Sequence, residues 1–190
     1  MRRSALALLP GALSALLGVS SCRGGDMGTR SPTAPSSEAA GGVPDNAALF
    51  RLITQTEPFA RYTLFPNADE FTDGRLNGSE AHRPTVRVSL NARAFAALQD
   101  GRLPAGAQFP TGSVIFKEVR PRADAPTTTY AVMYKDAGHP LAGDGWLWAE
   151  FSPDGAVGYS VSNRGAACTG CHRREQGPRN DLVRTIERQR

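Results

Sequence analysis

Residues 85–120 read TVRVSLNARAFAALQDGRLPAGAQFPTGSVIFKEVR and contain two strand patterns with a helical pattern between them. The first six residues alternate apolar and polar side chains, which is typical of a strand with one buried face. Asn91 can cap a short helix that we expect Gly101 to close, and residues 112–120 form the second strand pattern. This stretch predicts strands and helices that share one domain.

The flanking sequence continues the same mixture. Asp45 can cap a helix that ends near Pro58, and Asp181 can cap a final helix near the C-terminus. Further strand patterns, separated by short turns, occupy residues 127–135, 145–151 and 157–161. Consecutive strands joined by short turns pair antiparallel. The expected fold class is therefore α+β, a mostly antiparallel β-sheet with a few short helices.

Near the C-terminus, residues 168–172 read CTGCH, which is the attachment pattern of c-type haem. The spacing places the sulfurs of Cys168 and Cys171 on one side of a helical turn, where they can bond the vinyl groups of one porphyrin. His172 follows at the position of the axial iron ligand. We therefore expect one covalently bound haem c per chain.

A zinc site or a redox CxxC motif is the alternative interpretation of these cysteines. Zinc requires four ligands, and the chain has no second CxxC pair. His82 and His139 are far apart in the sequence, in segments predicted to be loops. A thioredoxin-like motif would open the helix of a βαβ unit, which the strand patterns do not predict. The sequence favours covalent haem.

The N-terminal part of the chain predicts export and anchoring. Residues 1–22 combine a basic start, an apolar stretch too short to span a bilayer, and a final VSSC that resembles the lipobox of bacterial lipoproteins. Residues 23–44 predict a flexible tether, which leaves 45–190 as the haem domain. We expect Cys22 to carry a lipid on the periplasmic side of a bacterial membrane. With an ordinary secretory signal, the alternative, the protein would be periplasmic without an anchor.

Composition and charge fit one globular domain that does not bind nucleic acid. The chain has 190 residues, of which 40% are hydrophobic, and this suffices for one buried core. The formal net charge of +4 falls by two when Arg2 and Arg3 leave with the signal. The remaining charge is too small for an electrostatic nucleic-acid binder.

Four segments resemble the cytochrome P-460 and cytochrome c′-β family, in the family's order. The resemblance covers roughly residues 79–186. The segments are HRPTVRVSLN (82–91), FPTGSVIFKEV (109–119), GWLWAEFSPDG (145–155), and CTGCH followed by DLVRT (181–185). The resemblance implies a small, mostly β-sheet homodimer with one haem whose iron is five-coordinate.

Lys117 falls where proteins of the P-460 branch carry a lysine bonded to the porphyrin edge. That branch oxidises hydroxylamine to nitrous or nitric oxide, whereas the c′-β branch lacks the bond and binds nitric oxide in an apolar distal pocket. Strand alternation puts Lys117 on the same face as Ile115 and Val119, an amine among aliphatic side chains. We expect Lys117 at the haem edge. The alternative is an edge strand from which the amine reaches water.

The resemblance also implies an acidic residue on the segment that leads into CTGCH. Between residues 152 and 167 the one acid is Asp154, which lies in a predicted turn. Asn163 and Arg164 are nearest to the expected place and are the distal candidates. The missing acid favours nitric oxide binding, whereas Lys117 favours the enzyme.

Met133, His82 and His139 are the other residues that can supply a second iron ligand. We expect Met133 to fill the core from its strand, His139 to be solvated in a Gly-rich loop, and His82 to lie at the surface or beside the ligands. Trp146 and Trp148 share one strand face and predict core or dimer packing.

Three functions follow in order of preference. The first is a P-460-type haem enzyme that oxidises hydroxylamine or nitric oxide. The second is a protein that binds nitric oxide without turnover, and the third is a periplasmic electron carrier, which would require a second strong iron ligand. The expected partners are a small nitrogen substrate or ligand and a redox protein.

Overall fold

The computed structural model describes residues 45–65, 72–73, 82, 84–174 and 177–185. The signal peptide predicted at 1–22, with Cys22, and the tether predicted at 23–44 lie outside these residues and stay predictions. None of the helices in the described ranges has the length and apolar character that a membrane span requires.

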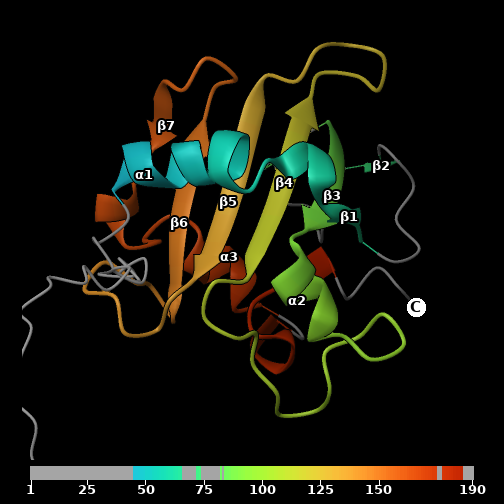
Figure 1. Ribbon diagram of the computed structural model, residues 1–190, viewed down its shortest axis with the longest axis vertical. Coiled ribbons are helices and arrows are strands. Elements are labelled where there is room, and N and C mark those ends of the chain that lie inside the picture. The colour runs from blue at the N-terminus through green and yellow to red at the C-terminus, as the bar shows by residue number, and fades with distance from the viewer. Residues whose placement is uncertain (1–44, 66–71, 74–81, 83, 175–176, 186–190) are drawn as a thin grey trace, which may run out of the picture. The chain divides into compact units, whose positions relative to one another are not determined.

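The described residues form seven strands in one antiparallel sheet, together with three short α-helices (Figure 1). The strands are β1 (Thr63–Leu64), β2 (Thr72–Asp73), β3 (Thr85–Leu90), β4 (Val114–Arg120), β5 (Thr129–Lys135), β6 (Trp146–Phe151) and β7 (Val157–Tyr159). The α-helices are α1 (Asn46–Arg51), α2 (Ala92–Ala96) and α3 (Thr169–His172). Four single turns of other helix types are η1 (Leu52–Thr56), η2 (Phe59–Arg61), η3 (Val161–Asn163) and η4 (Gly177–Asn180).

The strand order is β1-β3-β4-β5-β6-β7, with β2 also paired to β3. Each strand from β3 onward pairs antiparallel with the next one along the chain, which confirms the predicted α+β class. The strand predicted over 85–90 is β3 with the same bounds, and the other predicted strands differ by one or two residues at their ends. Alternation therefore predicted the sheet well, because each strand has two distinct faces.

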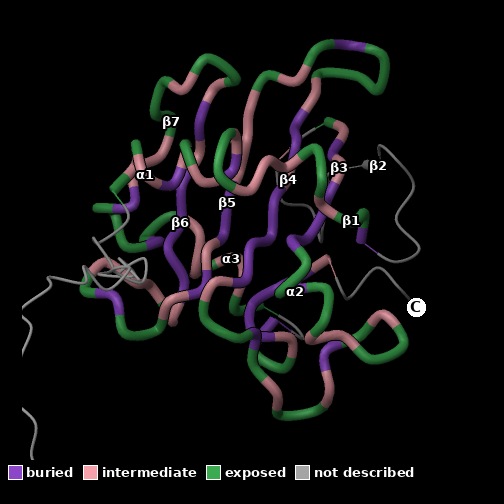
Figure 2. Tube along the Cα trace, in the orientation of Figure 1, coloured by how far each residue is buried: buried purple, intermediate pink, exposed green. Residues whose placement is uncertain are grey.

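The sheet is covered by different elements on its two faces. On one face, α1 and η1 bury Leu49 and Ile53 against Phe116 of β4, and Figure 1 shows α1 crossing in front of β5 and β6. On the opposite face, Ile115 of β4 packs in a second core with α2 and the C-terminal Val183. Figure 2 shows the buried positions concentrated along β4, β5 and β6. The functional residues described below lie on this second face.

Two of the three predicted helix N-caps are confirmed. The Asp45 carboxylate accepts the backbone N–H of Ala48 at 2.6 Å, and the Asn91 side chain accepts that of Ala94 at 3.0 Å. The helix capped by Asn91 ends at Ala96, so the predicted extension to Gly101 is wrong. The reason is a tight turn through Gly101, where the strand-like bridge between residues 99 and 102 replaces the helical hydrogen bonds.

The final helix predicted from Asp181 does not begin at that residue, and the part of it beyond residue 185 lies outside the described residues. Asp181 has φ of 49° and Leu182 has φ of 69°, so two successive residues lie in the left-handed region. The Asp181 carboxylate caps no helix; it accepts the backbone N–H of Phe109 at 2.9 Å and pairs with Lys135. These contacts tie the segment to Phe109 and to the end of β5.

Candidate functional site

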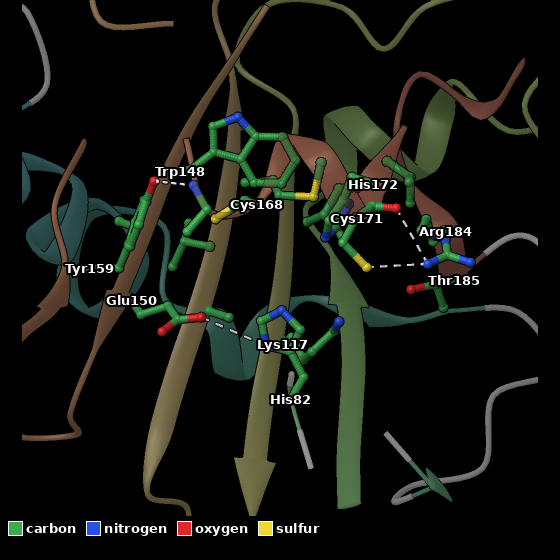
Figure 3. Close-up of a pocket in the computed structure, with 17 residues that line it drawn as sticks. His82, Lys117, Trp148, Glu150, Tyr159, Cys168, Cys171, His172, Arg184 and Thr185 are labelled. Atoms are coloured by element: carbon green, nitrogen blue, oxygen red, sulfur yellow. Dashed lines mark hydrogen bonds and ion pairs between the residues drawn. The ribbon is translucent and has the colours of Figure 1, made fainter. Parts of the chain in front are cut away.

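A pocket opens on the second face of the sheet, between β4, β5, β6, α3 and the C-terminal segment (Figure 3). Its empty volume is about 1100 Å³, mouth included. Its apolar walls include Ile115, Ala131, Met133, Trp148 and Val183.

Both cysteines of CTGCH line this pocket. Cys168 and Cys171 are half-buried thiols at the start and in the body of α3. Burial raises the pKa of Cys168 to about 11. The guanidinium of the buried Arg184 donates to the backbone oxygen and to Sγ of Cys171, each at 3.4 Å. The helical turn thus presents both sulfurs to one cavity, as the spacing predicted.

His172 is oriented by a backbone carbonyl. Its Nδ1 donates to the oxygen of Leu182 at 2.7 Å, which leaves the Nε2 lone pair as the metal-binding atom. Burial is the largest cause that lowers the pKa of His172 to about 4, so the imidazole is neutral. Its ring packs edge-on against Trp148, with centroids 4.7 Å apart. A neutral, fixed imidazole is what an axial iron ligand requires.

Two glycines let the chain pack closely around this motif. Gly165, with φ of 70°, lies against Trp148, and any side chain at this position would overlap the indole ring. Gly177 lies against the carbonyl group of His172 in the same way. The segments before and after α3 are therefore held near the pocket by contacts that no larger residue allows.

The residues fit a c-type haem. Two thiols, an oriented neutral imidazole and apolar walls meet in one cavity. Residues 76–185, more than half of the chain, match a family model described as cytochrome P460.

The chain belongs to the cytochrome P460 family. It is therefore a cytochrome with a haem iron cofactor, as the resemblance of its four segments implied. A search of curated proteins finds no match to the chain.

In this cytochrome P460 protein, Lys117 of β4 lines the pocket beside the haem motif (Figure 3). Its charge is a cause that lowers the pKa of His82, His172 and Glu150, so the amine lies within electrostatic reach of all three. Lys117 shares its strand face with Ile115, as alternation predicted. Lys117 does not sit on an edge strand, because β4 pairs with β3 and β5.

Sequence reasoning missed Glu150, which lines the pocket from β6. Burial raises the pKa of its carboxyl group above the usual value. The carboxylate Oε1 lies 3.8 Å from Nδ1 of His82, which also lines the pocket and is half-buried. Lys117 is the largest cause that lowers the pKa of His82, so this imidazole is neutral. The alternation of Trp146 and Trp148, continued by two residues, places Glu150 on this face.

Several other expectations about single residues need correction. Asn163 and Arg164 are exposed in and after η3 and are absent from the residues that line the pocket, so the structure does not bring them to it. His139 is buried, and its Nδ1 accepts the N–H of Leu141 at 2.9 Å, so it is not solvated. It too is absent from the pocket lining.

The remaining side chains lie in the core as expected. Met133 is buried in the second core and also reaches the pocket wall. Trp146 and Trp148 are buried in the same core, and the Trp146 indole donates to the backbone oxygen of Asp181 at 3.0 Å. Both tryptophans therefore support the face on which the pocket lies.

Proposed function

We propose that this protein is a c-type mono-haem enzyme of the P-460 branch that oxidises hydroxylamine or nitric oxide. The observation that carries the proposal is the shared pocket: Lys117, Glu150 and the three residues of the haem motif line one cavity. In this proposal Cys168 and Cys171 hold the haem through thioethers, one haem per chain, and His172 binds its iron. The haem supplies the redox chemistry.

Lys117 is proposed to bond the porphyrin edge. A bond to carbon requires a neutral amine, which a lysine in a partly desolvated site can provide and an arginine cannot. Of the 22 Lys and Arg residues in the chain, two are lysines, Lys117 and Lys135. Lys117 lines the pocket, and Lys135 is the last residue of β5. The apolar side chains of Ile115 and Met133 line the same pocket as the amine.

Glu150 and His82 are proposed to accept the protons that leave hydroxylamine during oxidation. Each oxidation step removes electrons and protons together, so a nearby base assists it. A carboxylate with a raised pKa and a neutral imidazole are both suited to this task. They would take the place of the acid that the family resemblance puts on the segment before CTGCH.

A nitric oxide-binding protein without turnover is the second candidate. The observation in its favour is the apolar wall made by Ile115, Met133 and Val183, which suits a small neutral ligand. An electron carrier ranks third. Met133 and His82 are the described pocket residues that could supply the second ligand; Met133 packs in the core, and His82 faces Glu150.

One experiment separates these functions. Haem-loaded protein is mixed with hydroxylamine and a chemical electron acceptor, and separately with nitric oxide after reduction. Turnover of hydroxylamine or nitric oxide supports the enzyme, whereas tight nitric oxide binding without turnover of either substrate overturns it in favour of the second candidate. A low-spin ferric spectrum that becomes high-spin in Met133→Leu would favour the electron carrier.

The cellular setting is proposed from the sequence. A lipid on Cys22 would tether the haem domain on the periplasmic side of a bacterial membrane, and a redox protein there would accept the electrons. A homodimer is the expected assembly. Fractionation and size-exclusion chromatography of the haem-loaded protein test these expectations.

A further inference from the structure

A buried ion pair joins the end of the sheet to the C-terminal segment. Nζ of Lys135, the last residue of β5, lies 2.7 Å from Oδ1 of Asp181, and the side chains are 4% and 6% exposed. Nζ also lies 4.9 Å from the ring centre of Trp146. Buried ion pairs add little net stability, because desolvation offsets the attraction. We therefore look for a role of this pair other than a contribution to stability.

Asp181 is held from three sides. Besides Lys135, its carboxylate accepts the backbone N–H of Phe109 at 2.9 Å. Its backbone oxygen accepts the Trp146 indole N–H at 3.0 Å. The ring of Phe109 packs edge-on against that of Trp146, with centroids 5.8 Å apart. Three elements distant in sequence thus fix the position of this one residue.

The backbone at this point is strained. Asp181 and Leu182 both have positive φ, a conformation that a leucine adopts at a cost. Such a turn persists only where its surroundings hold it. The turn directs the carbonyl oxygen of Leu182 to Nδ1 of His172, at 2.7 Å.

We infer that the Lys135–Asp181 pair is a positioning device for His172. The pair holds the turn, the turn holds the Leu182 carbonyl, and the carbonyl sets the tautomer, orientation and basicity of the imidazole. The inference rests on the proposed function in one respect, the assignment of His172 as the iron ligand. Lys135 touches neither substrate nor iron and acts through Asp181 and Leu182.

Two variants of the haem-loaded protein test the inference. Lys135→Met removes the amine, and Asp181→Asn removes the charge but keeps an amide oxygen for Phe109 and tolerates positive φ. The readouts are the iron–histidine stretching frequency of the ferrous protein and its reduction potential. We expect the frequency to fall and the potential to become more positive, because a weaker hydrogen bond makes the imidazole a poorer donor.

Arg87→Met is the matched control. Arg87 on β3 is 27% exposed, pairs with the buried Glu118 on β4 at 2.6 Å and does not line the pocket, so its loss tests the general effect of breaking a partly buried ion pair. The inference holds if the two test variants shift the frequency and the potential and the control does not. It is overturned if the melting temperatures fall while the spectra match those of the control. If Lys135→Met does not fold, the milder Asp181→Asn decides.

These readouts need no substrate. A protein that fails to oxidise hydroxylamine or to bind nitric oxide would still report the iron–histidine stretch. Failure of the proposed function is therefore distinguishable from failure of the positioning role.

Discussion

Lys117 and Glu150 lie in one row across the sheet, with Ala131 between them. In the strand register Lys117 is paired with Ala131, and Ala131 is paired with Glu150. Paired residues of antiparallel strands point to the same face, so the amine and the carboxylate flank the methyl group of Ala131, which also lines the pocket. Strand spacing puts their Cα atoms about 10 Å apart. We expect a small molecule to bind in the gap above the alanine, which His82 borders at 3.8 Å from Glu150.

Ala131→Leu should fill this gap. Overpacking costs about 1–3 kcal/mol, and at this place it would separate the two charged groups from the substrate. We expect kcat/KM for hydroxylamine to fall about tenfold or more, with haem content unchanged. Ala97→Leu, which enlarges a half-buried alanine outside the pocket, is the control and should keep its activity. Equal activity in the two variants would contradict the gap as a substrate site.

Lys117 should remain attached to haem after proteolysis. In a tryptic digest of the denatured protein, a peptide uncleaved after Lys117 should carry haem mass. Lys135 is the internal control, because cleavage there should be complete. Lys117→Arg keeps the charge but removes the nucleophile. That variant should lose the crosslink and at least tenfold in hydroxylamine turnover, while its cysteines still hold the haem. Normal cleavage after Lys117 in the wild-type digest would rule out the bond.

Glu150→Gln should impair hydroxylamine oxidation more than ligand binding. Removal of a general base lowers rates by about 10²–10⁴-fold, so we expect a fall of at least about 10²-fold in turnover. The affinity for nitric oxide should change by less than about threefold, since this neutral ligand gives up no proton. Asn163→Ala is the control and should be fully active. The assignment would be wrong if Asn163→Ala were inactive and Glu150→Gln active.

The haem should withstand acid–acetone extraction from denatured wild-type protein, because two thioethers hold it. Cys168→Ala and Cys171→Ala should each retain one thioether, and the double variant should release all of its haem. Absorption of the extracted phase measures the release. Free haem from the wild-type protein, matured in a host with c-type haem assembly, would refute the covalent attachment.

Cys22→Ala should abolish lipid attachment. The protein should move from the membrane fraction to an unprocessed or soluble form, as seen by immunoblot of fractionated cells. Replacement of the neighbouring Arg23 by Ala is the control, because it lies outside the lipobox and should leave fractionation unchanged. Membrane association and processing that persist without Cys22 would argue for another anchor.

The sheet and the haem motif were predictable because their signals are local. Alternation identified β3 to β6, and the caps at Asp45 and Asn91 act within three residues of themselves. The turn at Asp181 was not predictable, because its partner Lys135 is 46 residues away. The local sequence pattern predicts a helix at Asp181, but the long-range ion pair holds the backbone in a turn instead.

The site was predicted only in part, because some of its residues come together through long-range contacts. Lys117 followed from alternation and from the family resemblance. The resemblance drew attention to Asn163 and Arg164, whereas the pocket acid is Glu150 on β6. His82 reaches the pocket through the fold and not through any local pattern, so its contact with Glu150 required the structure.

The close approaches of Gly165 and Gly177 extend the haem motif into a longer signature. With glycine three residues before the first cysteine and five residues after the histidine, the pattern becomes G-x-x-C-x-x-C-H-x-x-x-x-G. Backbone crowding requires glycine at these two positions, whichever ligand or substrate binds the iron. Relatives that share this packing should carry both glycines even where the pocket residues differ. The signature would thus identify related proteins independently of the reaction that each one catalyses. Genome surveys can use it to group proteins before any of them is assayed.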